Sequence, residues 1–404
     1  MNSSYSMVNH RSQQNRLRYD NELTLDLNPD LSFTGLLRLE YNIDNLLVSH
    51  DHQRQNYSDW SKPHYVNDKL SLDLREFYLQ WYLEQHYFKI GKQQVAWGES
   101  DGLRVLDVIN PFDYSEFILQ DFDDSRIPIW MINYSSSFDA LTLQLLYIPD
   151  ATTSFIPDGL YQPTTPQLTP TLIGDYHNID IKPELGIKNR LKNADYAMRL
   201  STTVDGKDIS LVYINQYNDS YIYQSRLQDN NTLQLQAKYY RTNIFGLSYS
   251  QELGNVVLRS ELSVVDQQYF HTLNSQITDG IAKRSVFNYV LAFDWAAINE
   301  GMISGQLFQN IISGSAILLQ RDKVDSTWSL MFDKFFENQI YHLNLLYMQS
   351  INNKDGLIRI KTDWNINDEL VMSLGANYFF GNHNGIFGQY NNNDHINLSI
   401  KYTY

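Results

Sequence analysis

Apolar and polar side chains alternate one by one along most of the chain. In residues 17–27, apolar side chains such as Leu17 and Leu23 alternate with charged ones such as Arg18 and Asp26. Successive side chains of a β-strand point to opposite faces, so this period of two predicts strands with one apolar and one polar face. The same alternation is clear in residues 286–295, 357–366 and 396–404.

Counting such segments predicts about eighteen strands. They span residues 3–10, 16–28, 31–44, 69–84, 86–98, 127–138, 141–149, 195–205, 207–218, 231–253, 255–268, 284–297, 301–313, 327–337, 339–350, 356–367, 369–381 and 394–404. The weakest assignments are residues 3–10 and 231–253. We interpret 231–253 as one long strand that protrudes from the membrane, because a hairpin there would place residues 268–284 on the side of the short turns.

The lengths of these segments favour a membrane barrel. Many reach the roughly 9 to 11 residues with which a tilted strand crosses a bilayer, about twice the typical strand of a soluble protein. Tight turns such as Asn28-Pro29-Asp30 and Val204-Asp205-Gly206 alternate with long polar loops, as in outer-membrane barrels with short periplasmic turns and longer extracellular loops. We therefore predict an all-β fold: one transmembrane antiparallel β-barrel of 16 to 18 strands over residues 1–404. A soluble sandwich, propeller or β-helix is the alternative.

Composition narrows the function. The formal net charge is −15 and there is no cysteine, which excludes disulfide scaffolds, cysteine nucleophiles and thiolate metal sites. An acidic chain without a basic cluster also makes nucleic acid an improbable partner, since phosphates are bound by Lys and Arg. No run of about 18 to 20 apolar residues exists, and the first residues after Met1 are polar. The barrel interpretation therefore places the protein in the outer membrane of a Gram-negative bacterium, with its signal peptide absent from this chain.

Two long loops are candidates for the functional region. Residues 150–194 contain five of the ten prolines, and they fold into the lumen, cap its mouth or stay on the surface. Residues 99–126 combine many apolar side chains with eight carboxylates and two arginines, which predicts packing against the inner wall or another loop. The charged members, our candidates for a pore constriction, are Glu99, Asp101, Arg104, Asp107, Asp113, Glu116, Asp121, Asp123, Asp124 and Arg126.

Carboxylates near a pore favour cations by Coulomb attraction. A weaker alternative is a calcium ion held by Glu116, Asp121, Asp123 and Asp124, although the full calcium-loop signature is missing. The alternation also predicts lumen-wall residues of both signs. These are Glu22, Arg38, Glu40, Arg359, Lys361, Asp363 and Lys401.

One region resembles a known family. Arg75-Glu76-Phe77-Tyr78, then the run from Ile90 through Trp97-Gly98-Glu99 to Asn110-Pro111, and finally Arg126-Ile127-Pro128 resemble a large family of proteobacterial outer-membrane proteins classed as a domain of unknown function. The resemblance implies an envelope barrel, often suggested to work beside inner-membrane exporters of apolar or lipidic molecules. It supplies no catalytic residue.

The same region allows structural expectations. Gly91 and Gly98 leave room for close backbone contacts, and Trp97 is expected near the membrane surface, where indole rings favour the interface. Arg104 is expected to pair with Asp101 or Asp107.

These observations predict a porin-like channel for passive passage of small solutes, constricted by the acidic loop, without enzymatic activity or cofactor. The alternative is a plugged barrel that serves as the outer-membrane component of an export or uptake system for apolar or lipid-like molecules. Expected partners are outer-membrane lipid, lipopolysaccharide and the barrel-assembly machinery, which would recognise the C-terminal strand ending at Tyr404. Assembly into a homo-oligomer is a further option.

Overall fold

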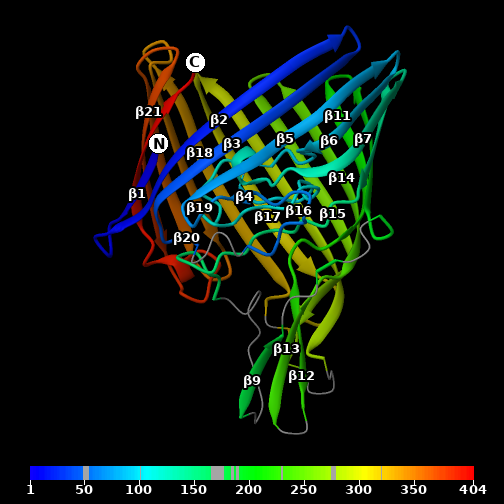
Figure 1. The fold of residues 1–404 in the computed structure, drawn as a ribbon, viewed down its shortest axis with the longest axis vertical. Coiled ribbons are helices and arrows are strands. Elements are labelled where there is room, and N and C mark those ends of the chain that lie inside the picture. The colour runs from blue at the N-terminus through cyan, green and yellow to red at the C-terminus, as the bar shows by residue number, and fades with distance from the viewer. Residues whose placement is uncertain are drawn as a thin grey trace.

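The computed structural model describes residues 1–48, 54–100, 102–164, 177–182, 186–187, 191–228, 231–273, 279–319 and 321–404. Within these residues, eighteen strands form one closed antiparallel ring, in which β1 pairs with both β2 and β22 (Figure 1). The fold predicted from the alternation is confirmed. In ring order the strands are β1 (Asn2–Ser6), β2 (Ser12–Asn28), β3 (Leu31–Asn45), β5 (Leu70–Leu83), β6 (His86–Gln93), β7 (Ile129–Phe138), β8 (Leu141–Ile148), β10 (Asp195–Val204), β11 (Lys207–Tyr217), β14 (Arg241–Leu253), β15 (Val256–His271), β16 (Ile281–Ile298), β17 (Gly301–Ile312), β18 (Val324–Phe336), β19 (Tyr341–Ser350), β20 (Gly356–Asn365), β21 (Leu370–Phe380) and β22 (His395–Tyr402).

The strand register explains why the ring has an apolar outside and a charged inside. Tyr19 lies opposite Leu39, which lies opposite Leu72, so apolar side chains line up across β2, β3 and β5. One residue further on, Asp20 lies opposite Arg38, and Arg38 opposite Asp73, so charges line up on the other face. A shift by one residue would turn every charge outward, and the alternation therefore specifies the register.

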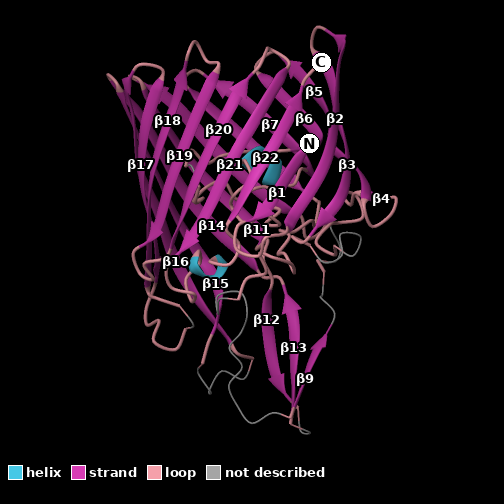
Figure 2. Cartoon of the chain, turned by 90° about the vertical axis from the view of Figure 1, so that its left-hand side faces the viewer, coloured by secondary structure: helices cyan, strands magenta, loops and turns pink. Residues whose placement is uncertain are grey.

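The two ends of the barrel differ in their connections. At the turn end, pairs such as β2–β3, β5–β6 and β18–β19 are joined by between two and four residues. Asp205 and Gly206 both have positive φ (51° and 70°), as a two-residue hairpin turn requires. The loop end carries the longer connections, and Figure 2 shows them gathered at the lower end of the barrel.

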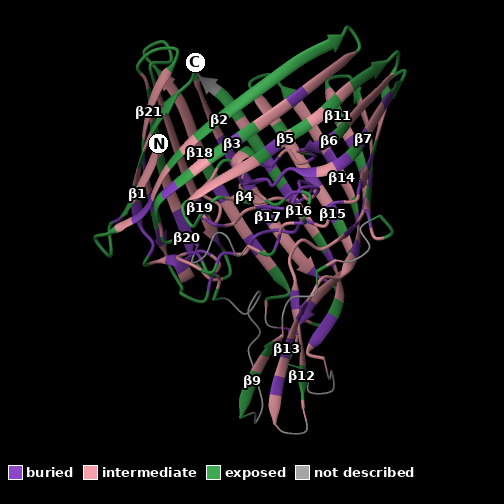
Figure 3. Ribbon diagram, in the orientation of Figure 1, coloured by how far each residue is buried: buried purple, intermediate pink, exposed green. Residues whose placement is uncertain are grey.

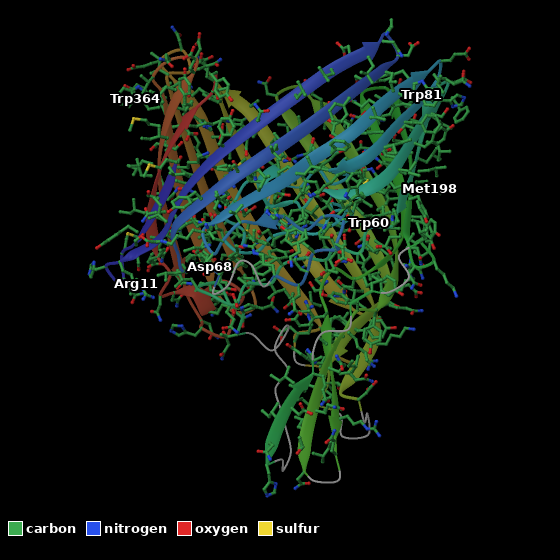
Figure 4. All side chains as sticks on the ribbon, viewed as in Figure 1. Arg11, Trp60, Asp68, Trp81, Met198 and Trp364 are labelled. Carbon is green, nitrogen blue, oxygen red and sulfur yellow. The ribbon has the colours of Figure 1, made fainter. Side chains whose placement is uncertain are left out.

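Aromatic side chains mark the outer surface near the turn end. Trp81 and Trp364, which are 45 % exposed, point away from the barrel on two sides of it (Figure 4). Indole rings prefer the membrane–water interface. Among the described residues, no helix is long and apolar enough to cross a membrane.

A second small sheet projects from the loop end. β12 (Ile222–Leu227) pairs antiparallel with β13 (Thr232–Lys238), and β13 pairs parallel with β9 (Asn178–Lys182) (Figure 1). The prediction of a single strand over 231–253 is therefore wrong, because the chain leaves β13 at Lys238 and enters the barrel only with β14. The alternation continues through both strands, which hid the break.

Three short elements complete the fold: β4 (His64–Tyr65), which pairs with β5, the helical turn α1 (Phe122–Ser125) and the 3-10 turn η2 (Gly388–Tyr390). The first strand is shorter than predicted, ending at Ser6. The strand predicted over 86–98 ends at Gln93, where the chain leaves the wall and begins the segment 94–128. Buried residues concentrate around this segment and the loop end, whereas the turn end is exposed (Figure 3).

Candidate functional site: the segment 94–128 and the charged inner wall

The segment 94–128 contacts opposite walls of the ring. On β15, the carboxylate of Glu261 accepts hydrogen bonds from the backbone N–H groups of Glu99 and of Leu106, the latter at 3.0 Å. On β2 and β3, Arg18 and Arg38 each donate to Asp124 at 3.0 Å. Because β15 lies half a circuit from β2 in the described ring, these anchors place the segment across the barrel.

Apolar contacts hold the same segment at the β15 side. Leu106, which is fully buried, packs with Val290 of β16 and Phe308 of β17. A Cβ on Gly246 of β14 would come within 2.4 Å of the Leu106 side chain. The wall therefore contains a gap, provided by glycine, into which this leucine fits.

An arginine-rich wall on β2 and β3 faces the other end of the segment. Arg16 lies 3.2 Å from Glu116, and Arg18 lies 3.0 Å from Asp124. Arg38 lies between Asp124 and Asp20, with N–O distances of 3.0 and 2.8 Å. The predicted wall residue Glu40 lies between Arg16 and Arg18. Acidic side chains of the segment thus meet basic side chains of the wall.

The helical turn α1 is attached to the wall through its backbone. The Nη2 atom of Arg75 on β5 donates to the carbonyl oxygens of Asp123, Asp124 and Arg126 at 3.1, 3.3 and 3.0 Å. The last carbonyls of a helical turn lack partners within the helix, so a guanidinium is a suitable donor for them.

A buried ion pair stabilises the segment internally. The guanidinium of Arg126 binds the Asp107 carboxylate through Nε at 3.0 Å and Nη2 at 2.9 Å, and both side chains are more than nine-tenths buried. Arg126 also contacts Asp123 at 2.5 Å, but that carboxylate is 93 % exposed. Asn110 adds bonds from its side chain to the carbonyls of Gln93 and Ile127, which join the two ends of the segment.

Asp113 forms an ion pair with Arg54, which lies in the loop between β3 and β4. Arg54 donates to it at 2.6 Å, and the Ser115 backbone N–H donates at 2.9 Å. Burial by itself would raise the pKa of Asp113, but attraction by Arg54 and the Ser115 hydrogen bonds outweigh burial and lower it. This carboxylate is therefore ionised in neutral solution.

The remaining candidates of the segment have different surroundings. The guanidinium of Arg104 stacks on Phe112, 3.2 Å from the ring centroid, and donates to the Tyr114 hydroxyl. The expected pairing of Arg104 with the Asp107 carboxylate is wrong, because Arg126 occupies that carboxylate and Arg104 donates to the Asp107 carbonyl instead, at 3.3 Å. Asp121 is exposed. Asp101 lies outside the described residues.

The calcium grouping is also wrong. Among the described residues, no three His, Asp or Glu side chains are gathered closely enough to hold a metal ion. Glu116, Asp123 and Asp124 each lie beside an arginine instead, at 3.2, 2.5 and 3.0 Å.

The expected interfacial position of Trp97 is wrong as well. Trp97 is 2 % exposed, packs with Val95 and Ile109 inside the barrel and donates through Nε1 to Gln144 of β8 at 2.8 Å. The chain has already left the wall at residue 93, so the alternation that placed Trp97 no longer applied. Gly98 does allow a close contact, since a Cβ there would meet the Asp107 backbone N at 2.9 Å.

The other predicted wall residues lie on β2, β20 and β22. Arg359 donates to the Leu119 carbonyl at 3.4 Å, which ties the segment to β20. Lys361 lies 3.6 Å from Asp363, which also contacts His342. Glu22 and Lys401 are exposed toward the turn end.

Among the described residues, sequence reasoning missed several that hold the segment. Arg16 and Arg18 alternate with apolar Leu17 and Tyr19, the same signal that identified Glu22, so they could have been found. The position of Arg75 beside a bulge between β3 and β5, and the contacts of Arg54 and Glu261 with the segment, depend on tertiary structure. The missed residues include Arg16, Arg18, Arg54, Arg75 and Glu261, and also Arg259 and Gln216, which donate to the carbonyls of Glu99 and Val108.

Further loops interlock with the segment at the loop end. Isolated bridges join Phe112 to Arg126 and Asp113 to Phe155. Phe117 has φ of 57° and packs its ring against those of Tyr161, Phe379, Phe387 and Tyr390. The described part of loop 150–194 therefore contacts both the segment and the loop before β22.

Comparison with solved structures relates this geometry to known barrels. The fold is similar to that of OccAB3 from Acinetobacter baumannii, with a TM-score of 0.54 and 9 % identity over 100 % of this chain and 96 % of that one. A Salmonella typhi OmpF complex with daunomycin has a TM-score of 0.46 and 10 % identity, over 100 % of this chain and 95 % of that one. No curated protein matches the sequence.

A family model matches far more of the chain than the resembling run of residues 75–131. The model, described as a protein of unknown function, covers residues 8–404. The match therefore includes the arginine-bearing strands β2 and β3, the segment 94–128 and the closing strand β22. The chain belongs to this family, DUF1302.

Proposed function

We propose that the protein is an outer-membrane channel for small polar solutes, in which the segment 94–128 narrows the lumen. The observation that carries this proposal is the attachment of the segment to opposite walls of a closed ring, by Glu261 on one side and Arg18 and Arg38 on the other. Barrels of 16 to 18 strands are wide enough for water and small solutes.

The charges at the constriction bear on selectivity. Asp113, Glu116 and Asp124 are compensated by arginines, so they add little net charge to the path. Asp121 and Asp123 are exposed, and the arginine beside Asp123, Arg126, is already compensated by the buried Asp107. These two are therefore the carboxylates of the segment that attract a passing cation most directly. The proposed cation preference therefore rests on these two residues.

A bilayer experiment tests the channel. Single-channel currents of the purified protein are measured in a salt gradient for the wild type, for Asp121→Asn with Asp123→Asn, and for Asp30→Asn as the control, because Asp30 is an exposed carboxylate in the turn between β2 and β3. We expect open conductance with a cation preference that falls in the double variant. A silent wild type would contradict the channel, and an unchanged permeability ratio would contradict the role of the two carboxylates.

A second candidate is the plugged barrel that serves export or uptake of apolar or lipid-like molecules. The aromatic cluster that joins Phe117 to Tyr161, Phe379, Phe387 and Tyr390 favours this candidate, because the cluster packs several loops against one another at the loop end of the barrel. A silent wild type together with a conducting Phe117→Ala variant would support this candidate.

The proposed orientation places the turn end in the periplasm and the loop end outside the cell, in an outer membrane of lipid and lipopolysaccharide. The C-terminal strand, with Ile400, Tyr402 and Tyr404 as alternating apolar residues, is proposed to be recognised by the barrel-assembly machinery. Depletion of that machinery is expected to leave the protein sensitive to protease in cell envelopes.

A further inference from the structure

A small cavity lies between the arginine-rich wall and the loop segments that face it. Its volume is about 80 Å³, and its lining combines β2, β3 and β5 with residues of the segment 94–128 and of the loop before β5. Arginines dominate the cationic part of this lining: Arg16, Arg18, Arg38, Arg54 and Arg75.

Four of these arginines already have carboxylate partners. Arg16 and Arg18 contact Glu40, Arg38 contacts Asp124, and Arg54 contacts Asp113. Asp73, which also lines the cavity, lies 3.3 Å from Lys92 of β6. The charges of these four arginines are thus largely compensated by carboxylates, without any contribution from Arg75.

Arg75 differs from the other four. Its Nη2 atom makes the three bonds to the carbonyls of Asp123, Asp124 and Arg126, and none of these partners is a carboxylate. The residue is only 6 % exposed, and its Nε atom, like that of Arg18, is buried without a hydrogen-bond partner; the lack of a carboxylate partner is what separates Arg75 from the other four. A buried guanidinium with an unused donor is costly unless a ligand or water meets it.

The rest of the lining limits what the ligand can be. Ser71, Gln14 and Tyr57 offer neutral polar groups, and burial raises the pKa of Tyr57, so its hydroxyl stays protonated. The carboxylates Asp73, Asp113 and Asp124 also line the cavity, and they would repel a dianion such as phosphate more strongly than a monoanion. A volume of about 80 Å³ corresponds to about five to eight waters, at about 10 to 15 Å³ each.

We propose that this cavity is a binding site for a short monocarboxylate, whose carboxylate meets Arg75 and whose tail lies against Ser71 and Tyr57. A guanidinium pairs with a planar carboxylate in a fixed geometry. This proposal depends on the proposed channel only in one respect, namely that the channel brings the solute to the cavity. The cavity would then bind the solute as it passes the segment 94–128.

Calorimetric titration of the full chain in detergent micelles tests the site. The probes are propionate, its neutral isostere propionamide, and inorganic phosphate. We expect saturable binding of propionate, at least tenfold weaker binding of the other two, and at least tenfold weaker propionate binding by Arg75→Gln. Arg199→Gln is the matched control, because Arg199 is a half-buried arginine of β10 that lies outside the cavity.

Arg75→Gln also removes the hydrogen bonds that hold the segment 94–128, so a second variant is needed that changes the cavity without changing Arg75. Ser71→Leu fills the cavity and leaves every bond of Arg75 in place, so it is expected to abolish propionate binding while the gel shift of the folded barrel persists. Propionate binding that survives in both variants, or propionamide binding as tight as propionate, would overturn the site. Because the titration needs no current, a barrel that binds propionate but is silent in bilayers would overturn the channel and leave the site standing.

Discussion

At the scale of single residues, burial decides what each carboxylate of the segment does. Asp107 and Asp123 both bind Arg126, yet the Asp107 side chain is 3 % exposed and that of Asp123 is 93 % exposed. An exposed ion pair contributes little, because water screens both charges, whereas removing one partner of a buried pair leaves a charge without compensation. The same arginine therefore has one structural and one nearly dispensable partner.

This contrast gives a direct test of stability. Asp107→Asn is expected to lower the free energy of unfolding by about 3 kcal/mol or more, because it leaves Arg126 buried beside a neutral group. Asp123→Asn is the control and should change it by less than about 1 kcal/mol. Urea unfolding in detergent micelles measures both, and equal losses would contradict the assignment.

The pairing of Asp124 predicts a dependence on pH. Burial alone would raise the pKa of Asp124, but attraction by Arg18 and Arg38 lowers it below the ordinary aspartate value. A lowered folded-state pKa contributes stability above the unfolded value of about 4, and this contribution is lost as the pH falls through the folded pKa. The stability difference between wild type and Asp124→Asn should therefore be constant from about pH 5 to 8 and shrink below about pH 4.

Urea unfolding over this pH range measures the difference. Asp26→Asn, at an exposed position of β2 near the turn end, provides the baseline for loss of one negative charge. A difference between wild type and Asp124→Asn that changes between pH 6 and 8 would show that Asp124 is not held ionised by the two arginines.

At the scale of elements, the ring and its projections are separable. Tyr217 of β11 lies directly opposite Arg241 of β14, and the ladder runs from there to Lys207 and Gln251. The hairpin β12–β13 leaves the ring between these strands and pairs with β9 outside the barrel. Strand pairing within the ring thus does not depend on the hairpin.

Replacement of residues 221–238 by a short Asn-Gly turn tests this separation. Asn218 is kept in this variant, because its backbone N–H donates to the Tyr240 carbonyl at 2.9 Å. The new turn then only has to connect the two chain segments that this hydrogen bond already holds together. We expect a folded barrel with the heat-dependent gel shift of the wild type. Loss of the shift would mean that the hairpin is needed to pair β11 with β14.

At the scale of the whole molecule, closure depends on one short strand. β1 contributes five residues: all five pair with β22 on one side, and the first four of them pair with β2 on the other. A closed ring leaves no unpaired backbone edge in lipid, which explains why so short a strand is retained between two longer ones.

Engineered cysteines can report this closure, because the chain has no cysteine of its own. Ser4 and Asn397 lie directly opposite each other across the seam, and Cβ atoms of such pairs approach within disulfide range. Ser4→Cys with Asn397→Cys should form a disulfide on mild oxidation. Ser4→Cys with Ser399→Cys, two residues out of register, is the control, and equal crosslinking of both pairs would contradict the register.

The sequence by itself determined the barrel, its charged inner wall and most strand positions, because a period of two is a local property that the membrane and the lumen both enforce. Leu17, Arg18 and Tyr19 carry that information without reference to any distant residue. The acidic segment was also identifiable, since its mixture of carboxylates and apolar side chains is unlike a solvated loop.

Only the tertiary structure decided which charges meet. Arg16 meets Glu116 and Arg38 meets Asp124 across about a hundred residues of chain, and alternation says nothing about such pairings. Trp97 became a buried residue for the same reason, because the chain leaves the wall at residue 93 and the local pattern ends there. The unpartnered Nε of Arg75 exists only in the folded molecule, where the wall and the segment come together around a shared cavity.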